Sequence, residues 1–582
     1  MSPNQSASPM EAGPSDTTLQ DAAPPSPSRA QNLPHEITHE IFVLFRETFQ
    51  PYTDTGLTHA SLILSHVCRR WRYVSLFYPR LWNELSLKDE ESTVAVLARG
   101  GNDTPLDVDF RCKRKPSSTR LNAILRFVEE LSRVRKLHIT SINEVLNFWY
   151  NTLNQCSAPM LEDFSVISLG EQELFVFQAN FLGGPFSHLK KLRLENCDLD
   201  WRAPIFTDVM TELTLVDVPF PTSYMGVRRM VSAFENMPNL INLSISFLPR
   251  STIITDHNED FPEVPTLENM QWPISTLSKL QRLDLVGMVT HCGRFLSLNR
   301  PGPNTTVNLT LEYNARKEDW SEACDDLFDG LDTFLEDVIF DALNIGKIAR
   351  WQWSFYAGQS NHNQNQWPFT PITRDPSHSS LAGGYGTPTN RIPIDRQRFN
   401  LSISFGSRGS PPTHEHVLSF LCHVLCQLRV GDTLRTLHLA SKAKLNEDWL
   451  TRPLGRMPQL ENFSLEFIEP MKALLILFGL PCQSLEEYDH CLSTDHVCSQ
   501  DLYMHKLKRL EVYEPDAGAS QTSSERHDVW QDFLRGMRLR KSNRHRWMCV
   551  LLRECDLEEK IVCDLQGTVQ QVTQAFSPPV SD

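Results

Sequence analysis

LKKLRL, residues 189–194, has leucines at its first, fourth and sixth positions, and this form returns along much of the chain. Leu192 and Leu194 are two residues apart, which places both on one face of a β-strand. The pattern predicts one short strand for each copy, with its alternate apolar side chains in a shared core. The further copies are VRKLHI from Val134, LEDFSV from Leu161, LINLSI from Leu240, LQRLDL from Leu280, LRTLHL from Leu434, LENFSL from Leu460 and LKRLEV from Leu507, with weaker copies MTELTL from Met210 and TVNLTL from Thr306.

The spacing of these segments indicates a repeat array. From Val134 to Thr306, successive copies start 27, 28, 21, 30, 40 and 26 residues apart. Most of these values lie near the roughly 20 to 29 residues of a leucine-rich repeat. Several copies follow a proline (APMLEDFSV, MPNLINLSI, MPQLENFSL), which ends a preceding helix. One copy arises by chance in any leucine-rich protein, so the inference depends on the repetition and the shared lead-in.

The stretch before the repeats has the periodicity of helices instead. In NLPHEITHEIFVLFRETF, from Asn32, apolar residues recur at steps of three and four, and Pro34 suits the first turn of a helix. A second helical region is predicted from about Leu57 to Phe77, and Pro79 ends it. Its apolar stripe consists of Leu62, Val67, Cys68, Trp71 and Val74.

Three pieces of this stretch together resemble the F-box. They are Leu33-Pro34-x-Glu36-Ile37, then Val67-Cys68-Arg69-x-Trp71-Arg72, then Pro79-x-Leu81-Trp82. The stretch is most similar to the F-box-like domains of fungal proteins that have irregular leucine-rich repeats behind them. The link ETFQPYTDTGLTHAS between the first helices is longer than in compact F-boxes.

The resemblance implies a function and a set of contact residues. In that family the F-box helices dock onto the Skp adaptor, which joins a cullin scaffold with a RING subunit, and the repeats hold a protein target. The chain is thus expected to be a substrate-recognition subunit of a cullin-RING (SCF-type) ubiquitin ligase, with no catalysis of its own. The alternative is a leucine-rich-repeat interaction scaffold without a ligase role, whose helices cap the array. By position in the motif, the adaptor-binding residues would be Leu33, Pro34, Ile37, Ile41, Leu62, Val67 and Trp71, while Val67, Cys68, Trp71 and Trp82 would lock the helices together.

The fold expected from these observations is α/β: an N-terminal three-helix F-box-like module followed by an irregular leucine-rich-repeat solenoid of short parallel strands with helices and loops. The Ser- and Pro-rich residues 1–30 are expected to be a disordered arm. The predicted boundaries are 31–87 for the helical module, 88–355 for the first part of the solenoid, 356–396 for a flexible insertion, 397–515 for the second part and 516–582 for a C-terminal helical segment and loose tail.

Catalytic and metal-binding motifs are not found in the sequence. No nucleotide-binding loop, GxSxG or HExxH occurs, and the spacing of Cys482, His490, Cys491, His496 and Cys498 matches no structural zinc site. We therefore expect no enzymatic activity, no metal and no cofactor. The basic runs RCKRK (111–115) and RLRKSNRHRW (538–547) are typical of solvated faces, with nuclear import or phosphate binding as alternatives.

Charge and hydropathy limit the partners that are expected. The net charge of −15 argues against a nucleic-acid ligand, because phosphate binding needs a basic face. The longest apolar run, ALLILFGL from Ala473, is far shorter than the roughly 20 residues of a membrane-spanning helix. The first residues have no basic start and no apolar run, so no secretory signal is expected. The expected location is the cytoplasm, the nucleus or both.

Overall fold

The structure of the chain is a computed structural model. It describes residues 33–48, 60–170, 173–184, 186–221, 223–247, 274–302, 305–313, 325–331, 342–349, 352–358, 397–405, 434–440, 459–466, 507–513, 531, 534, 538, 549–553, 559–569 and 571–575. The N-terminal arm predicted over 1–30 and the cysteine–histidine cluster of 482–498 lie outside these residues.

The chain divides into two compact units, and the first is mostly helical. It comprises the residues up to 86 together with 91–104, and the second comprises 87–90 and the chain from 105 onward. The elements of the first unit are α1 (His35–Thr48), α2 (Ala60–Val67), α3 (Arg69–Leu76), the 3₁₀-helix η2 (Pro79–Trp82), the short strand β1 (Glu84–Leu85) and α4 (Glu90–Gly100).

One helical region was predicted from Leu57 to Phe77, and the structure corrects this. Cys68 has extended backbone angles, φ −156° and ψ 170°, and separates α2 from α3. Its Sγ accepts a hydrogen bond from the amide of Trp71 at 3.4 Å, so Cys68 caps α3. Val67 and Trp71 keep the four-residue spacing across the break, and periodicity therefore could not reveal it.

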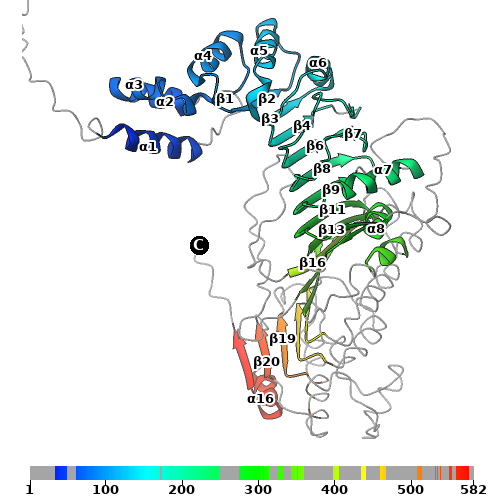
Figure 1. Cartoon of the computed structure of the whole chain (residues 1–582). Helices are drawn as coiled ribbons and strands as arrows, with labels where there is room; N and C mark the ends of the chain where they lie inside the picture. The colour runs from blue at the N-terminus through cyan, green and yellow to red at the C-terminus, as the bar shows by residue number, and fades with distance from the viewer. Residues whose placement is uncertain are drawn as a thin grey trace, which may run out of the picture. The chain divides into compact units, whose positions relative to one another are not determined.

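The second unit is an α/β structure built on parallel strands (Figure 1). Its first strands pair side by side in the order β2, β3, β4, β6, β8, β9, β11 and β13, all parallel. Each LxxLxL segment from Val134 to Thr306 lies in or runs into one of these strands, as the pattern predicted. The bounds are β2 (Leu106–Cys112), β3 (Val134–Ser141), β4 (Asp163–Ser168), β6 (Lys191–Glu195), β8 (Glu212–Val218), β9 (Asn242–Phe247), β11 (Arg282–Met288) and β13 (Thr306–Tyr313).

The register of this sheet aligns the repeated leucines. The fourth position of each segment forms one buried row, and the sixth position forms the next. The first row is Leu137, Phe164, Leu192, Leu213, Leu243, Leu283 and Val307; the second is Ile139, Val166, Leu194, Leu215, Ile245, Leu285 and Leu309. Each Å² of apolar surface that these rows remove from water contributes about 25 cal/mol to the free energy of unfolding. This burial is the main stabilising term of the unit.

The weaker copy TVNLTL was placed two residues too late. Thr306 pairs with Arg282, not with Leu280, so Val307 and Leu309 occupy the two buried rows. The strand continues past them, and Leu311 is buried as well. This additional leucine produced the misleading match.

The sheet continues beyond β13 through β16 (Gln397–Phe405), β15 (Gln352–Gly358) and β14 (Ala342–Ala349), of which β15 is antiparallel to both neighbours. β15 includes residues 356–358 of the predicted insertion, and 359–396 lie outside the described residues. β14 then pairs with β17 (Thr436–Ala440), followed by β18 (Asn462–Glu466) and β19 (Arg509–Tyr513), all parallel.

The C-terminal part differs from the prediction of a helical segment and loose tail. β20 (Cys549–Arg553) and β21 (Gln571–Ala575) add two more parallel strands next to β19, with α16 (Glu559–Thr568) between them. The strand CVLLR lacks the LxxLxL spacing, and QVTQA has few apolar residues. Neither strand therefore stood out in the sequence.

This unit also contains helices and two small sheets, and residues 325–331 are helical as well. The helices are α5 (Ser118–Val128), η3 (Leu131–Arg133), α6 (Asn143–Leu153), α7 (Tyr224–Glu235) and α8 (Val289–Leu298), and the paired short strands are β5 (Phe175–Phe177) with β7 (Cys197–Leu199) and β10 (Ser275–Leu277) with β12 (Asn299–Pro301). Trp149 of α6 is fully buried and meets Phe110 edge-on, with ring centroids 5.3 Å apart. Such contacts fix the helices onto the leucine rows.

Candidate functional site

One exposed apolar surface of the first unit lies along α1. Ile37 is 48% exposed and Leu44 is 58% exposed, and Ile41 between them is half-buried. Their spacing of four and then three residues puts them on one stripe of the helix. Thr38 and Phe42, on the adjacent face, are buried and turn α1 toward the rest of the unit. The stripe is therefore available to a partner.

The N-terminal end of this stripe is tied to α3. The Arg70 guanidinium donates a hydrogen bond to the carbonyl oxygen of Leu33, which is half-buried. Pro34 next to it is exposed, and its carbonyl accepts from the hydroxyl of Thr38 at 3.0 Å. Arg70 thus positions the first residue of the predicted contact set.

The remaining predicted contact residues come from α2 and α3. Leu62 is half-buried, whereas Val67 at the end of α2 is 57% exposed. Trp71 is half-buried, and its ring packs edge-on against Phe42 with centroids 5.0 Å apart. Trp71 is thus part of the packing between α1 and α3, while Val67 belongs to the surface.

Trp82 holds the end of the first unit together, in agreement with the expectation that it locks the helices. Its ring is 2% exposed, and its Nε1 donates to the carbonyl of Ser75 at 2.7 Å. The guanidinium of Arg99 lies over the same ring, 4.4 Å from the centroid. One aromatic side chain therefore joins α3, η2 and α4.

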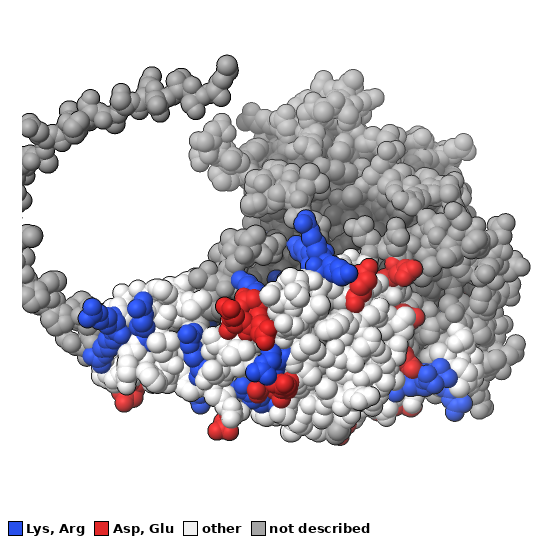
Figure 2. Space-filling model, turned by 90° about the horizontal axis from the view of Figure 1, so that it is seen from above, with Lys and Arg blue, Asp and Glu red and all other residues white. Residues whose placement is uncertain are grey.

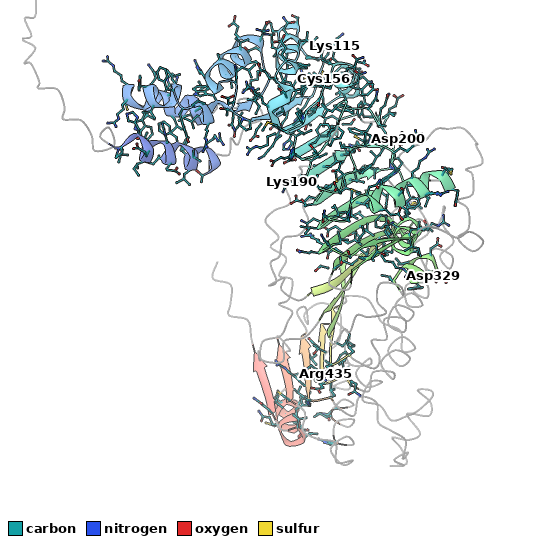
Figure 3. The ribbon with its side chains drawn as sticks, in the orientation of Figure 1. Lys115, Cys156, Lys190, Asp200, Asp329 and Arg435 are labelled. Carbon is teal, nitrogen blue, oxygen red and sulfur yellow. The ribbon has the colours of Figure 1, made fainter. Side chains whose placement is uncertain are left out.

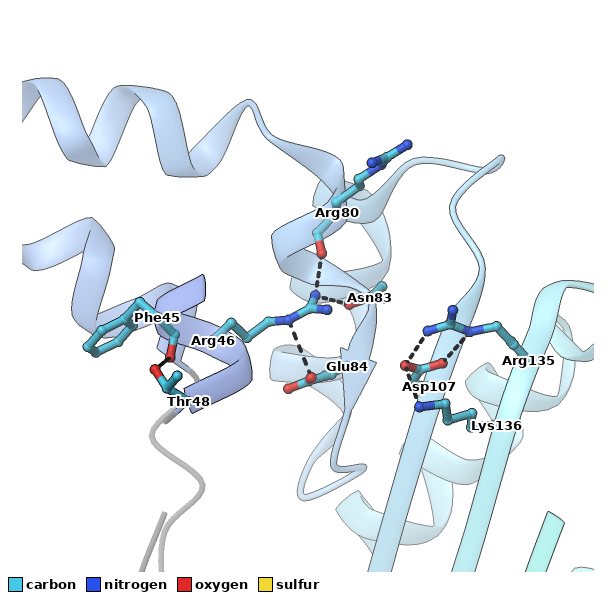
Figure 4. Close-up of polar contacts among 9 residues, drawn as sticks. All are labelled: Phe45, Arg46, Thr48, Arg80, Asn83, Glu84, Asp107, Arg135 and Lys136. Atoms are coloured by element: carbon cyan, nitrogen blue, oxygen red, sulfur yellow. Dashed lines mark hydrogen bonds and ion pairs between the residues drawn. The ribbon is translucent and has the colours of Figure 1, made fainter. Parts of the chain in front are cut away.

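Arg46 connects the C-terminal turn of α1 to η2 (Figure 4). Its Nη1 donates to the carbonyl of Arg80 and to Oδ1 of Asn83, both at 2.6 Å. Its Nε lies 3.6 Å from a carboxylate oxygen of Glu84. These bonds hold the exposed stripe of α1 in a fixed orientation relative to α3 and η2.

Among the described residues of the first unit, four exposed apolar residues were not among the predicted contacts: Leu44, Tyr73, Phe77 and Val94. Leu44 continues the stripe of α1, seven residues after Ile37. Tyr73 and Phe77 lie on the outer side of α3, with ring centroids 4.8 Å apart, and Phe77 is 72% exposed. The signal for this pair was present in the sequence, because Tyr73 and Phe77 are four residues apart and therefore lie on one side of the helix.

The outer face of the parallel sheet is a second candidate surface, in the other unit. Between the buried rows, alternate residues form polar rows across the strands. One row is Lys136, Asp163, Lys191, Glu212, Asn242, Arg282 and Thr306; the next is His138, Ser165, Arg193, Thr214, Ser244, Asp284 and Asn308. Across β8, β9, β11 and β13, most side chains of this outer face carry hydroxyl or amide groups. That part of the face therefore offers hydrogen bonds rather than apolar area.

Charges on this face largely neutralise one another. Lys191 Nζ lies 2.7 Å from Glu212, and Arg282 Nε lies 2.8 Å from Asp284. At the edge of the face, Asp107 accepts two hydrogen bonds from Arg135 at 2.7 and 3.1 Å (Figure 4), and this bonding raises the pKa of Arg135. Away from this face, Figure 2, which shows the molecule from above, also has basic and acidic side chains side by side. A strongly charged ligand would have to displace these pairs.

Two groups near the carboxyl ends of β6 and β8 titrate abnormally. Burial raises the pKa of the Cys197 thiol to about 12, so this cysteine stays protonated and unreactive. Burial also raises the pKa of Asp217, although its carboxylate accepts a hydrogen bond from Ser246 at 3.2 Å. Neither has the geometry of a nucleophile with an adjacent base.

The described ranges contain neither a metal-binding cluster nor a membrane-spanning helix. Among those residues, no three His, Cys, Asp or Glu side chains are grouped so that they would hold a metal ion. No helix formed by them is long and apolar enough to cross a membrane.

No protein-family model matches the chain, and no curated protein matches it.

Proposed function

We propose that this chain is the substrate-recognition subunit of a cullin-RING (SCF-type) ubiquitin ligase. The first unit would be an F-box-like module that binds a Skp-type adaptor, and the parallel strands would be an irregular leucine-rich-repeat solenoid that binds a protein target. The observation that supports this proposal best is the exposed apolar stripe of Ile37, Ile41 and Leu44 on a helix that begins with the Leu33-Pro34 motif.

The stripe suits a protein partner for a physical reason. Specific protein interfaces bury apolar side chains at their centre and have a polar rim. Ile37 and Leu44 leave apolar area in water, and the exposed Glu36 and Glu40 border them on α1. Arg46 and Arg70 hold the helix in place, so an adaptor would meet a preformed surface and lose little conformational entropy on binding.

The mechanism under this proposal is proximity. One unit binds the adaptor, the sheet face binds the target, and the ligase assembly supplies the reactive thioester. A tethered target reacts as if its local concentration were raised to about the millimolar range. No residue of this chain takes part in bond making, which agrees with the absence of catalytic motifs in the sequence.

Binding to the Skp adaptor tests the proposal. Ile37→Glu places a charge in the centre of the stripe, and we expect the affinity for purified adaptor to fall by at least about tenfold, because the charge must be desolvated. Val176→Glu is the matched control, since Val176 is 56% exposed on β5 of the other unit. Calorimetry of adaptor binding gives both affinities, and circular dichroism checks that each variant is folded.

Two results contradict parts of the proposal. If Ile37→Glu binds the adaptor as tightly as the unchanged chain, α1 is not the docking element. If the unchanged, folded chain does not bind the adaptor, the chain is an interaction scaffold without a ligase role.

A further inference from the structure

An excess of positive charge lies between β2 and α5. Residues 110–128 contain six Lys and Arg residues and no Asp or Glu. Arg111, Lys113, Arg114 and Lys115 are all exposed, and they occupy the end of β2 and the loop before α5. The exposed Ser118 follows at the start of that helix. Residues 111–115 form the basic run RCKRK, to which the proposed function assigns no role.

Arg111 of the loop pairs with Asp109 at 3.0 Å, but two other residues of the loop differ in their pairing from the basic positions of the sheet. Lys136, Lys190, Lys191, Arg193, Arg282 and Lys508 each lie within 4.0 Å of a carboxylate oxygen. Arg114 and Lys115, by contrast, form no ion pair with any residue in the described ranges. Their charges therefore remain available to an anionic group from outside the chain.

The backbone of the loop is held in place by neighbouring side chains. Cys112 Sγ donates to the carbonyl of Arg114 at 2.9 Å, and Ser141 Oγ donates to the carbonyl of Cys112 at 2.8 Å. Arg120 donates to the carbonyl of Arg111 at 2.5 Å, and its guanidinium lies 4.7 Å from the centroid of Phe110. The charges thus project from a loop with a fixed backbone, which reduces the entropy lost on binding.

We propose that this loop, Arg111 to Lys115, docks an acidic segment of a partner protein. Carboxylates pair bidentately with Arg and as point charges with Lys, and hydroxyls such as that of Ser118 add hydrogen bonds. A short acidic peptide fits better than a nucleic acid for two reasons. Asp107 and Asp109 precede the loop on β2, and the whole chain has a net charge of −15, which repels a long polyanion.

Anisotropy of a fluorescent peptide of ten glutamates, titrated with the full chain, measures this binding. Arg114→Gln with Lys115→Gln is expected to weaken the binding by about tenfold, because two unpaired charges are lost. Lys190→Gln with Lys191→Gln is the matched control, because it changes the net charge equally. Lys190 and Lys191 stand at the amino end of β6, whereas Lys115 follows the carboxyl end of β2, so they lie at opposite edges of the sheet (Figure 3). The control is expected to bind within about twofold of the unchanged chain.

Each other outcome overturns the proposal. Equal losses in both double variants mean that net charge, and not this loop, determines the binding. No binding of the peptide at about 50 mM salt, where exposed charges are weakly screened, means that the loop does not dock acidic segments. Tighter binding of a ten-nucleotide RNA that depends on Arg114 and Lys115 identifies the surface as a nucleic-acid site. None of these results depends on adaptor binding by α1.

Discussion

Asp217 near the end of β8 has a positive φ of 53° and a half-buried carboxyl group. Burial is the largest cause of its raised pKa, and the nearby Glu195 raises the pKa further. Because the folded pKa lies above the unfolded one, this group lowers the free energy of unfolding as pH rises through the folded value. Asparagine is uncharged and tolerates a positive φ.

We therefore expect Asp217→Asn to raise the midpoint of thermal unfolding at pH 7 and to change it little near pH 4. Asp200→Asn is the control, because its effect on the midpoint is expected to have the opposite sign. The Arg202 guanidinium lowers the pKa of Asp200, so its contribution is present at neutral pH and is lost as pH falls. Circular dichroism at several pH values distinguishes the two signs, and an equal response of both variants would contradict the assignment.

At the scale of single residues, the sequence predicted which residues belong to a helix better than it predicted which of them are exposed. The motif of Leu33 and Pro34 identified the start of α1, and periodicity identified Ile37 and Ile41. The same periodicity grouped Val67 with Trp71, although Val67 is on the surface and Trp71 packs against Phe42. The difference arises from the helix break at Cys68, which depends on local backbone angles and not on hydropathy.

At the scale of elements, two glycines allow a close helix contact. A Cβ on Gly293 of α8 would lie 2.5 Å from the backbone nitrogen of Leu327, and one on Gly330 would lie 2.6 Å from the carbonyl oxygen of Gly293. Arg294 and Asp326, both largely buried, pair across the same contact at 2.9 Å. The helical residues 325–331 thus approach α8 closely enough to exclude any side chain at these two positions.

Gly293→Ala is expected to destabilise this contact by about 1–3 kcal/mol, because backbone atoms must move apart. Gly567→Ala in α16 is the matched control, since a Cβ there would meet nothing within 4 Å. It is expected to be neutral or to stabilise by about 0.4–1 kcal/mol, through a less flexible unfolded chain. Urea unfolding followed by tryptophan fluorescence measures both changes, and a neutral Gly293→Ala would show that α8 and 325–331 are less closely packed.

Strand existence was predictable at this scale, and strand limits were not. LxxLxL identified β3, β4, β6, β8, β9 and β11, since each segment needs two inward residues separated by one outward residue. β2 and β20 do not have this spacing and were missed. Lateral hydrogen bonding to a formed neighbour extends a sheet over weaker sequences, and that influence comes from tertiary structure.

At the scale of the whole second unit, buried rows connect many strands. Leu243 of β9 is buried between Leu213 of β8 and Leu283 of β11. Its replacement leaves a cavity that three strands share. Ser244, the next residue, lies in a polar row on the other face of the same strand.

We expect Leu243→Ala to cost about 2–5 kcal/mol and Ser244→Ala less than about 1 kcal/mol. Amide hydrogen exchange locates the effect. Protection is expected to fall in β8, β9 and β11 together for Leu243→Ala, because repeats are stabilised mainly by their neighbours. A loss confined to β9 would mean that the rows do not couple the strands.

The register of β9 and β11 has a broader consequence. Leu240 and Leu280 are 40 residues apart, whereas Met210 and Leu240 are 30 apart, yet both strand pairs align in the same way. Adding chain at a strand end costs about 0.6 kcal/mol per doubling of loop length, while a shift of one residue within a strand would turn its leucines into water. Mutation can thus lengthen and diversify the connections between strands freely. The spacing of two residues between the inward leucines of each strand, by contrast, must stay constant.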